Sequence, residues 1–366
     1  MVIMRFLGLK KQTKLSISCH LADHCNLKCK GCDNYSCIAQ KKYADFETFE
    51  KDLKRLKEIF INNVENIYLL GGEPLLNKNV EDFMSCARNI FNNTNIHLVS
   101  NGILFENMPE SFWKCAKLNN ISIEYTEYPI KYNKSFLNIV KSKYDVEIKR
   151  FGHENDALKT LQFIPFDLSG KQDIIENYKK CFHANKCIQL REGKIYTCNI
   201  RAYADLFCDK FGVNMHFSNE DYIEIYQDIT QDEIFEFLSK PIPFCRYCNI
   251  KGRRNNHIWR TISDNYSIYD WANFELDNQG IEYLNKKGNV CFVVDKIDKN
   301  ILFDSNNENI KFKWIIIPVD DLDTFEAFDK DIQYVVCVPR DDLLYDVESK
   351  LVEKNANNIL YMKTSN

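Results

Sequence analysis

The sequence predicts an α/β protein built around a parallel sheet, and two observations support this fold class. Apolar runs of strand length at residues 67–70 and 96–99 each lead into a polar turn. An amphipathic stretch precedes each run, with apolar residues at helical spacing: Phe49, Leu53, Leu56 and Phe60, then Val80, Phe83, Met84, Ala87 and Phe91. Such alternation is typical of βαβ units, whose ligand sites lie at the carboxyl ends of the strands.

Further strands are expected along the chain at residues 121–125, 146–151 and 161–164. The residues after 254 differ in character. Residues 255–286 are polar and aromatic without a strong period, and we interpret them as a linker. Residues 287–366 contain four apolar runs and one amphipathic stretch, which predict a small α/β domain of Rossmann-like character.

This last domain shows no sequence signature of a nucleotide site. No glycine fingerprint follows its first apolar run, which argues against dinucleotide binding. Residues 287–366 hold fifteen Asp or Glu against ten Lys or Arg. This acidic balance fits a protein partner or a plain solvated surface.

Three cysteines after the first apolar run form the most specific motif. Cys25, Cys29 and Cys32 stand at C-x3-C-x2-C spacing directly after the run at residues 15–19. Three thiols on one loop bind three irons of a cubane cluster and leave the fourth iron open to a small molecule. The alternatives are a zinc knuckle that lacks its fourth ligand, or cysteines that are merely buried.

Together with the turns of the other strands, this motif resembles the radical S-adenosylmethionine (SAM) superfamily. The shared features are the cysteine loop after the first strand, a GGE turn after the second and a polar ending on the fourth. The resemblance covers about residues 13–165 and implies a partial (β/α)6 TIM-like barrel. It also implies a SAM-binding [4Fe–4S] cluster that cleaves SAM reductively to a 5′-deoxyadenosyl radical.

The resemblance assigns roles to several residues at the strand ends. Gly71 and Gly72 would let backbone carbonyls approach the methionine amine of SAM, and Glu73 would add negative charge beside it. Ser100 and Asn101 are expected to bind the ribose. Glu124 is a further candidate, with a solvated strand-end carboxylate as the alternative. Gly31 stands where many members carry an aromatic residue that touches the adenine, so adenine stacking must come from elsewhere.

A second group of cysteines lies downstream, at Cys181, Cys187, Cys198, Cys245 and Cys248. The alternating string LREGKIYTC predicts a β-hairpin with a Glu-Gly turn, which brings Cys198 near Cys181. With the later C-x2-C pair, this pattern resembles the twitch domain, a half-sized SPASM extension that carries one auxiliary [4Fe–4S] cluster. A zinc ribbon of four cysteines is the alternative.

Five cysteines compete for four ligand positions in this second group. Cys187 either replaces Cys181 as a ligand or remains a thiol near the substrate. Such a thiol would act catalytically by donating a hydrogen atom to a carbon radical, as in radical SAM epimerases. The third interpretation is an inert buried thiol.

These assignments divide the chain into four segments. Residues 1–165 are the expected radical SAM core, 166–254 the twitch-like domain, 255–286 the linker and 287–366 the acidic domain. The net charge of −4 argues against a nucleic-acid partner, and no apolar segment reaches the length of a membrane span. Fifteen cysteines without a secretory signal indicate a reducing compartment, so we expect a cytoplasmic protein.

The substrate class follows from resemblance rather than from any single residue. The strings HCNLKCKGCDNYSCIA and LLGGEPLL look like a group of radical SAM proteins found with surface-polysaccharide genes. We therefore expect oxidation or epimerisation of a sugar, aminosugar or nucleotide-linked sugar, with a flavodoxin- or ferredoxin-type reductant. One alternative is a peptide-modifying radical enzyme. Only about twelve residues precede Lys14, too few for a peptide-binding wing before the first strand, which disfavours this alternative. The other is a non-catalytic cluster-bearing scaffold that docks a partner through its C-terminal domain.

Overall fold

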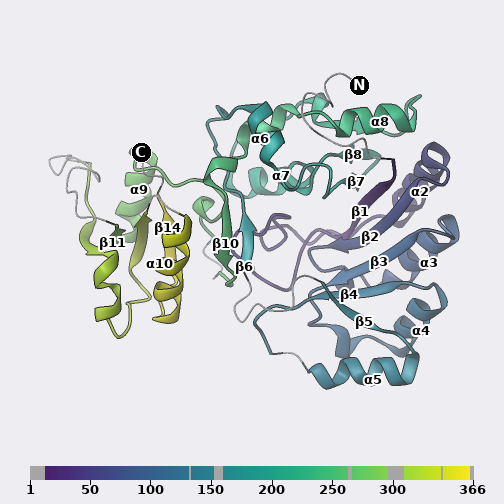
Figure 1. Ribbon diagram of the computed structural model, residues 1–366, viewed down its shortest axis with the longest axis horizontal. Helices are drawn as coiled ribbons and strands as arrows, with labels where there is room; N and C mark the ends of the chain where they lie inside the picture. The colour runs from purple at the N-terminus through teal and green to yellow at the C-terminus, as the bar shows by residue number, and fades with distance from the viewer. Residues whose placement is uncertain are drawn as a thin grey trace. The chain divides into compact units, whose positions relative to one another are not determined.

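The computed structural model describes residues 13–131, 133–151, 160–262, 266–295, 309–338 and 341–362 (Figure 1). The chain divides into two compact units. The first unit takes residues up to 159, 170–247 and 261–264, and the second takes residues 160–169, 248–260 and those from 265 onward. Each unit is described by itself below.

The first unit is built on an eight-stranded sheet with the order β5-β4-β3-β2-β1-β7-β8-β9. The first five strands along the chain pair in parallel: β1 (Leu15–Ala22), β2 (Val64–Gly71), β3 (Asn95–Ser100), β4 (Ser122–Thr126) and β5 (Ile148–Phe151). This confirms the predicted parallel sheet. The remaining strands are β7 (Gln189–Arg191), β8 (Lys194–Tyr196) and β9 (Tyr222–Glu224), of which β7 pairs in parallel with β1.

Four helices connect the parallel strands and cover one face of the sheet (Figure 1): α2 (Phe46–Phe60), α3 (Val80–Ile90), α4 (Glu110–Leu118) and α5 (Lys134–Tyr144). Alternate strand residues such as Ile17, Leu69 and Leu98 face these helices and are fully buried. Because strand side chains alternate between faces, the residues between them point to the opposite side of the sheet. Asp45 caps the N-terminus of α2, because its side chain accepts a hydrogen bond from Thr48 N.

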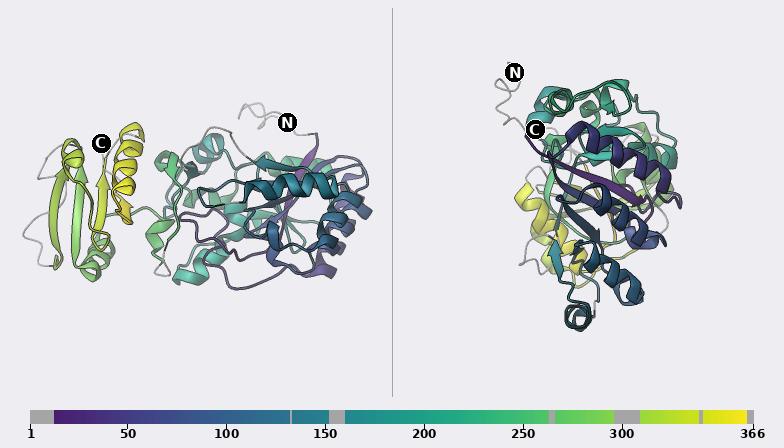
Figure 2. Two further views of the ribbon diagram at one scale, coloured as in Figure 1. Left: turned by 90° about the horizontal axis from the view of Figure 1, so that it is seen from below. Right: turned by 90° about the vertical axis from the view of Figure 1, so that its right-hand side faces the viewer.

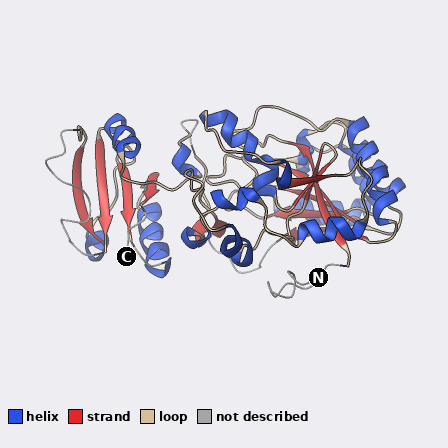
Figure 3. Cartoon of the chain, turned by 90° about the horizontal axis from the view of Figure 1, so that it is seen from above, coloured by secondary structure: helices blue, strands red, loops and turns tan. Residues whose placement is uncertain are grey.

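The second half of the first unit contains the predicted β-hairpin. Strands β7 and β8 pair antiparallel, and the turn residues Glu192 and Gly193 have φ values of 51° and 76°. These positive angles are typical of a tight two-residue hairpin turn. The helices α6 (Ile174–Lys180), α7 (Asn199–Phe211) and α8 (Gln231–Leu238) complete this half (Figure 1). Figure 3 distinguishes the helices from the strands by colour.

The second unit holds two sheets of its own. Strands β6 (Thr160–Phe163) and β10 (Arg254–Ile258) form an antiparallel pair. The other sheet is fully parallel with the order β12-β11-β13-β14, where β11 is Asn289–Val294, β12 Lys313–Pro318, β13 Gln333–Cys337 and β14 Asn358–Tyr361 (Figure 2). Apolar clusters cover both faces of this sheet, and they include residues of α9 (Asn278–Lys287) and α10 (Asp341–Glu353).

Two expectations differ from the structure. The strand expected at residues 161–164 is β6, but β6 pairs with β10 and does not extend the parallel sheet of the first unit. Residues 255–286, expected as a linker, contain most of β10 and most of α9. Strands β6 and β10 form through pairing with each other far apart in the sequence, which local apolar periodicity does not reveal. Helix α9 buries only Gly280, Ile281 and Leu284, which give a weak helical period.

In the part of the chain that the structure describes, no helix is long and apolar enough to cross a membrane.

Candidate active site

The cysteine triplet lies on the loop between β1 and α2, which we call the cluster loop (residues 23–45). Burial raises the pKa of the Cys25 thiol, and the neighbouring Cys32 and Cys29 raise it further. Burial also raises the pKa of Cys32. The three thiols are thus close enough to affect one another's charge, as expected for ligands of one site.

A fourth cysteine accompanies the triplet and was missed in the sequence. Cys37 donates a hydrogen bond from Sγ to the backbone oxygen of Cys29, at 3.4 Å. Burial raises the pKa of Cys37, as do the thiols of Cys32, Cys29 and Cys25. The sequence did offer a signal for this cysteine, since Cys37 follows Cys32 by only five positions. In the structure its thiol is directed to a backbone carbonyl by the hydrogen bond.

The GGE turn packs directly on the cluster loop. Gly72 N donates to Ala22 O at 2.9 Å, and Glu73 N donates to His24 O at 3.1 Å. A Cβ atom at Gly71 would lie 2.3 Å from Ala22 O, and one at Gly72 would lie 2.3 Å from His24 O. The glycines are therefore required by the close approach of the cluster loop backbone, which gives them a role that the sequence alone did not indicate.

Glu73 is completely buried at the end of β2. Its carboxylate accepts hydrogen bonds from Ser100 Oγ at 2.8 Å, Asn101 N at 2.8 Å and Leu75 N at 3.1 Å. Burial raises the pKa of Glu73 to about 7, although these hydrogen bonds favour the ionised form.

Asn101 completes the connection between the strand ends and the cluster loop. Its side-chain nitrogen lies 2.7 Å from Asn26 Oδ1 and 3.6 Å from Cys25 Sγ. The structure thus brings together the predicted site residues Cys25, Glu73, Ser100 and Asn101. Ser100 and Asn101 have partners inside the protein, in addition to any ribose contact.

Glu124 is held in a different part of the sheet. Its Oε1 lies 2.6 Å from His97 Nδ1, and the His97 ring stacks on Tyr68 with ring centroids 4.7 Å apart. The hydrogen bond from His97 lowers the pKa of Glu124. Asn66 extends this polar chain, because its Oδ1 lies 3.4 Å from His97 Nε2 and its Nδ2 donates to Ser16 Oγ at 2.8 Å.

Four cysteines of the second group meet in the first unit. They lie at the C-cap of α6 (Cys181), before β7 (Cys187), at the N-cap of α7 (Cys198) and in a 3-10 turn at Pro243–Tyr247 (Cys245). Burial raises the pKa of Cys198, with further increases from the other three thiols. Burial and the Cys181 thiol raise the pKa of Cys245 to about 12.

Cys248 belongs to the second unit. It lies in an isolated β-bridge with Phe166 of that unit. The assignment of Cys248 as a metal ligand remains a prediction.

Two polar contacts join the cluster loop to the second group of cysteines. His183 Nε2 lies 3.1 Å from Asp33 Oδ2, and Asn199 Nδ2 donates to Asn34 Oδ1 at 2.9 Å. Burial alone would lower the pKa of His183, but Asp33 and the Cys187 thiol raise it to about 10. This shift favours the charged form of His183, which lies beside Asp33 of the cluster loop and near Cys187, a position for which the sequence gave no signal.

The thiol groups of the cysteine triplet are donors of the kind that bind iron–sulfur clusters. All fifteen cysteines lie in the described residues, and none forms a disulfide. Within the described ranges, no three His, Cys, Asp or Glu side chains converge in the manner required to hold one metal ion. The thiols of a cluster bind separate irons, so they need not converge on one point. The Cys25, Cys29 and Cys32 thiols on one loop fit this chemistry.

Comparison with known proteins gives similarities over part of the chain. A GTP 3′,8-cyclase from Clostridium botulinum strain Hall is 30% identical over 105 residues, which cover 28% of this chain and 33% of that protein. One from Alkaliphilus oremlandii is 29% identical over 113 residues, which cover 31% and 35%. The chain thus spans about a third of the length of these curated relatives.

Solved structures overlap a larger share of the chain at low identity. BtrN in complex with AdoMet and 2-DOIA is 17% identical, covers 64% of this chain and 94% of its own, and gives a TM-score of 0.41. Native anSMEcpe with bound AdoMet is 15% identical, covers 64% and 89%, and gives a TM-score of 0.39.

The family comparison covers the segment that carries the cluster loop, the GGE turn and the ends of β3 and β4. Residues 20–148 match the model of the radical SAM superfamily. This match agrees with the parallel sheet and with the position of the cysteine triplet after its first strand. Residues 20–148 are therefore a radical SAM superfamily domain.

Proposed function

We propose that the protein is a radical SAM enzyme that acts on a small sugar-type molecule. The observation that carries this proposal is the meeting of Cys25, Glu73 and Asn101 at one end of the parallel sheet. Cys25, Cys29 and Cys32 would hold a [4Fe–4S] cluster. When bound, the cluster and SAM supply a 5′-deoxyadenosyl radical, with the electron delivered by a flavodoxin- or ferredoxin-type protein.

The buried polar groups would orient SAM at this end of the sheet. Glu73 is fixed by three hydrogen bonds, so its position is set before a ligand arrives. In its ionised form, Glu73 would attract the ammonium group of the methionine moiety. Ser100 and Asn101 would contribute to the ribose contact while holding Glu73 and the cluster loop in place.

The polar face of the sheet supports a hydroxylated substrate. Ser16, Asn66, His97 and Glu124 form a hydrogen-bonded chain across four strands, on the face opposite the helices. Hydroxyl groups both donate and accept hydrogen bonds, so a sugar or polyol matches such a surface better than an apolar molecule. A hydrogen atom would be removed from a carbinol carbon, and oxidation or epimerisation would follow.

Cys187 would decide between these two outcomes. As a hydrogen donor, it would return a hydrogen atom to the carbon radical and complete an epimerisation. The thiyl radical left on Cys187 would be restored to the thiol by one electron from the flavodoxin- or ferredoxin-type reductant and one proton. As a ligand of a second [4Fe–4S] cluster in place of Cys181, it would favour electron removal and oxidation. The contact with His183 holds the Cys187 thiol in a defined polar environment in either case.

Anaerobic reconstitution with iron and sulfide tests this proposal. We expect about eight irons per chain, and 5′-deoxyadenosine after reduction by dithionite in the presence of SAM. About four irons with SAM cleavage would assign the second group of cysteines to zinc. Failure to cleave SAM under well-reduced conditions would overturn the enzyme assignment and favour the scaffold. Turnover of a peptide, and of no sugar, would favour the peptide-modifying alternative.

A further inference from the structure

A cavity of about 330 Å³ lies in the first unit, apart from the cysteine triplet and the GGE turn. Strands β1 and β7 pair at Ser18 and Gln189, and the cavity is lined by residues that follow this pair on both strands. Its walls also include the start of α2 and part of α7. The main polar lining residues are His20, Asp23, Lys42, Asp52, Arg191, Glu192, Tyr203 and Tyr226.

Two buried side chains in this cavity lack hydrogen-bond partners in the described structure. His20 is 8% exposed, and neither of its ring nitrogens is hydrogen-bonded. Its Nδ1 lies 3.7 Å from Asp23 Oδ1, which is too long for a hydrogen bond. The His20 ring stacks on Tyr203 with centroids 3.7 Å apart, and the Tyr203 hydroxyl also lacks a partner.

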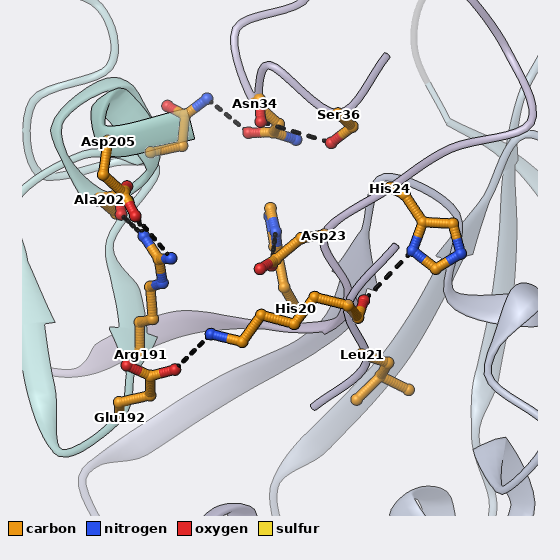
Figure 4. Close-up of polar contacts among 12 residues, drawn as sticks. His20, Leu21, Asp23, His24, Asn34, Ser36, Arg191, Glu192, Ala202 and Asp205 are labelled. Atoms are coloured by element: carbon orange, nitrogen blue, oxygen red, sulfur yellow. Dashed lines mark hydrogen bonds and ion pairs between the residues drawn. The ribbon is translucent and has the colours of Figure 1, made fainter. Parts of the chain in front are cut away.

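Two of the three cationic side chains around the cavity, Arg191 and Lys42, are paired with carboxylates, and the third, Lys51, lies over the Tyr226 ring at 4.3 Å. Arg191 donates to both carboxylate oxygens of Asp205, at 2.7 and 2.9 Å, and Lys42 lies 2.7 Å from Glu192 (Figure 4). Asp23 is 8% exposed and lies beside His20 in the cavity wall. The cavity therefore offers a buried carboxylate and two side chains with unsatisfied polar atoms, whereas Arg191 and Lys42 are held by Asp205 and Glu192.

Unsatisfied buried polar atoms are rare, so the two ring nitrogens of His20 and the Tyr203 hydroxyl together indicate a missing ligand. We propose that this cavity binds a small amine that also carries hydroxyl groups. Its ammonium group would bind Asp23, and its hydroxyl groups would bind His20 and Tyr203. A volume of about 330 Å³ is at the lower end of the range for small-molecule sites.

The position of this site gives the ligand a way to affect the cluster loop. Asp23 N donates to Lys42 O at 3.0 Å, and His24 Nδ1 lies 3.2 Å from the same oxygen (Figure 4). Asp23 and Lys42 thus join the two ends of the cluster loop. A ligand on Asp23 would steady the loop that carries Cys25, without touching the cysteine triplet.

Binding of glucosamine and glucose to the reconstituted full-length protein, without SAM or reductant, tests the site. We expect glucosamine to bind and glucose to bind about tenfold more weakly, because glucose lacks the ammonium group. Equal binding of the two sugars would overturn the amine assignment. Because no SAM cleavage is measured, failure here leaves the proposed function intact.

Two conservative variants localise the binding. His20→Phe and Tyr203→Phe should each weaken glucosamine binding about fivefold or more, because each removes one hydrogen bond to the ligand. Tyr222→Phe is the matched control, since its hydroxyl bonds Asn219 Oδ1 at 2.8 Å, away from the cavity. Tyr203→Phe should not lower the melting temperature of the protein. Unchanged binding in both cavity variants, or only water in a crystal soaked with glucosamine, would overturn the proposal.

Discussion

The two groups of cysteines are assembled in different ways. Cys25, Cys29 and Cys32 lie on one loop, so the local chain already keeps their thiols close. Cys181, Cys198 and Cys245 come from three separate segments, and only the folded unit brings them together. Closing a longer loop costs more conformational entropy. The first site therefore depends mainly on its loop, whereas the second depends on the fold of the unit around it.

The largest expected effect comes from the first group. Cys29→Ala removes one of three ligands that the loop supplies, so we expect complete loss of 5′-deoxyadenosine formation while the protein stays folded. Cys37→Ala is the matched control, because Cys37 lies on the same loop but bonds a backbone oxygen. If Cys37→Ala also abolishes SAM cleavage, Cys37 is a fourth ligand of the cluster. This result would contradict the proposal that one iron lacks a protein ligand.

The second group should show a more selective loss. Cys245→Ala is expected to lower the iron content from about eight to about four per chain, while the SAM cluster remains. Iron analysis and electron paramagnetic resonance of the reduced protein measure this. Loss of all iron would show that the first site requires the second, and that it does not depend mainly on its own loop.

Cys187 distinguishes a ligand from a hydrogen donor. We expect Cys187→Ala to keep both clusters and lose turnover of substrate, because the structure places the thiol beside His183. Iron content and product formation are measured on the same sample. If iron is lost along with turnover, Cys187 is a ligand and the epimerase interpretation is wrong.

Glu73 should produce a pH-dependent stability. Burial raises its pKa to about 7, from 4.5 in the unfolded chain, so the native state binds more protons between these values. The free energy of unfolding of the metal-free protein should therefore fall as the pH rises from 4.5 to about 7, by about 3 kcal/mol at most. Glu73→Gln should flatten this slope in denaturant titrations. An unchanged slope would show that Glu73 is ionised throughout.

The smallest effect is expected at the contact between the two groups. His183→Gln removes the ion pair with Asp33 but keeps a hydrogen-bonding side chain, so we expect SAM cleavage to fall about threefold to tenfold. Asn199→Ala breaks the parallel contact with Asn34 and should act similarly. Wild-type cleavage rates in both variants would show that the two groups of cysteines work independently.

Local sequence patterns predicted the helices and strands whose formation depends on neighbouring residues in the sequence. The apolar periodicity of Phe49 to Phe60 and the runs ending at Gly71 and Ser100 correctly predicted the helix and strands of the parallel sheet. The position of the cysteine triplet after β1 follows from the same pattern.

The rest depends on contacts between distant residues. The pairing of β6 with β10, the contact of His183 with Asp33 and the hydrogen bond from Ser100 to Glu73 each join residues far apart in the sequence. Polar pairs of this kind leave no periodic signal, so only the folded structure reveals them. The twitch-like and Rossmann-like assignments and the metal ligands stay predictions.

The position of β1 within its sheet affects how the protein is made. β1 pairs with β2 on one edge, whereas its partner on the other edge, β7, leaves the ribosome only after about 170 more residues. During synthesis, one edge of β1 is therefore exposed beside the new cysteine loop. Unpaired strand edges promote association between chains. Nascent chains of this protein should thus depend on chaperones until the β7–β8 hairpin has been made.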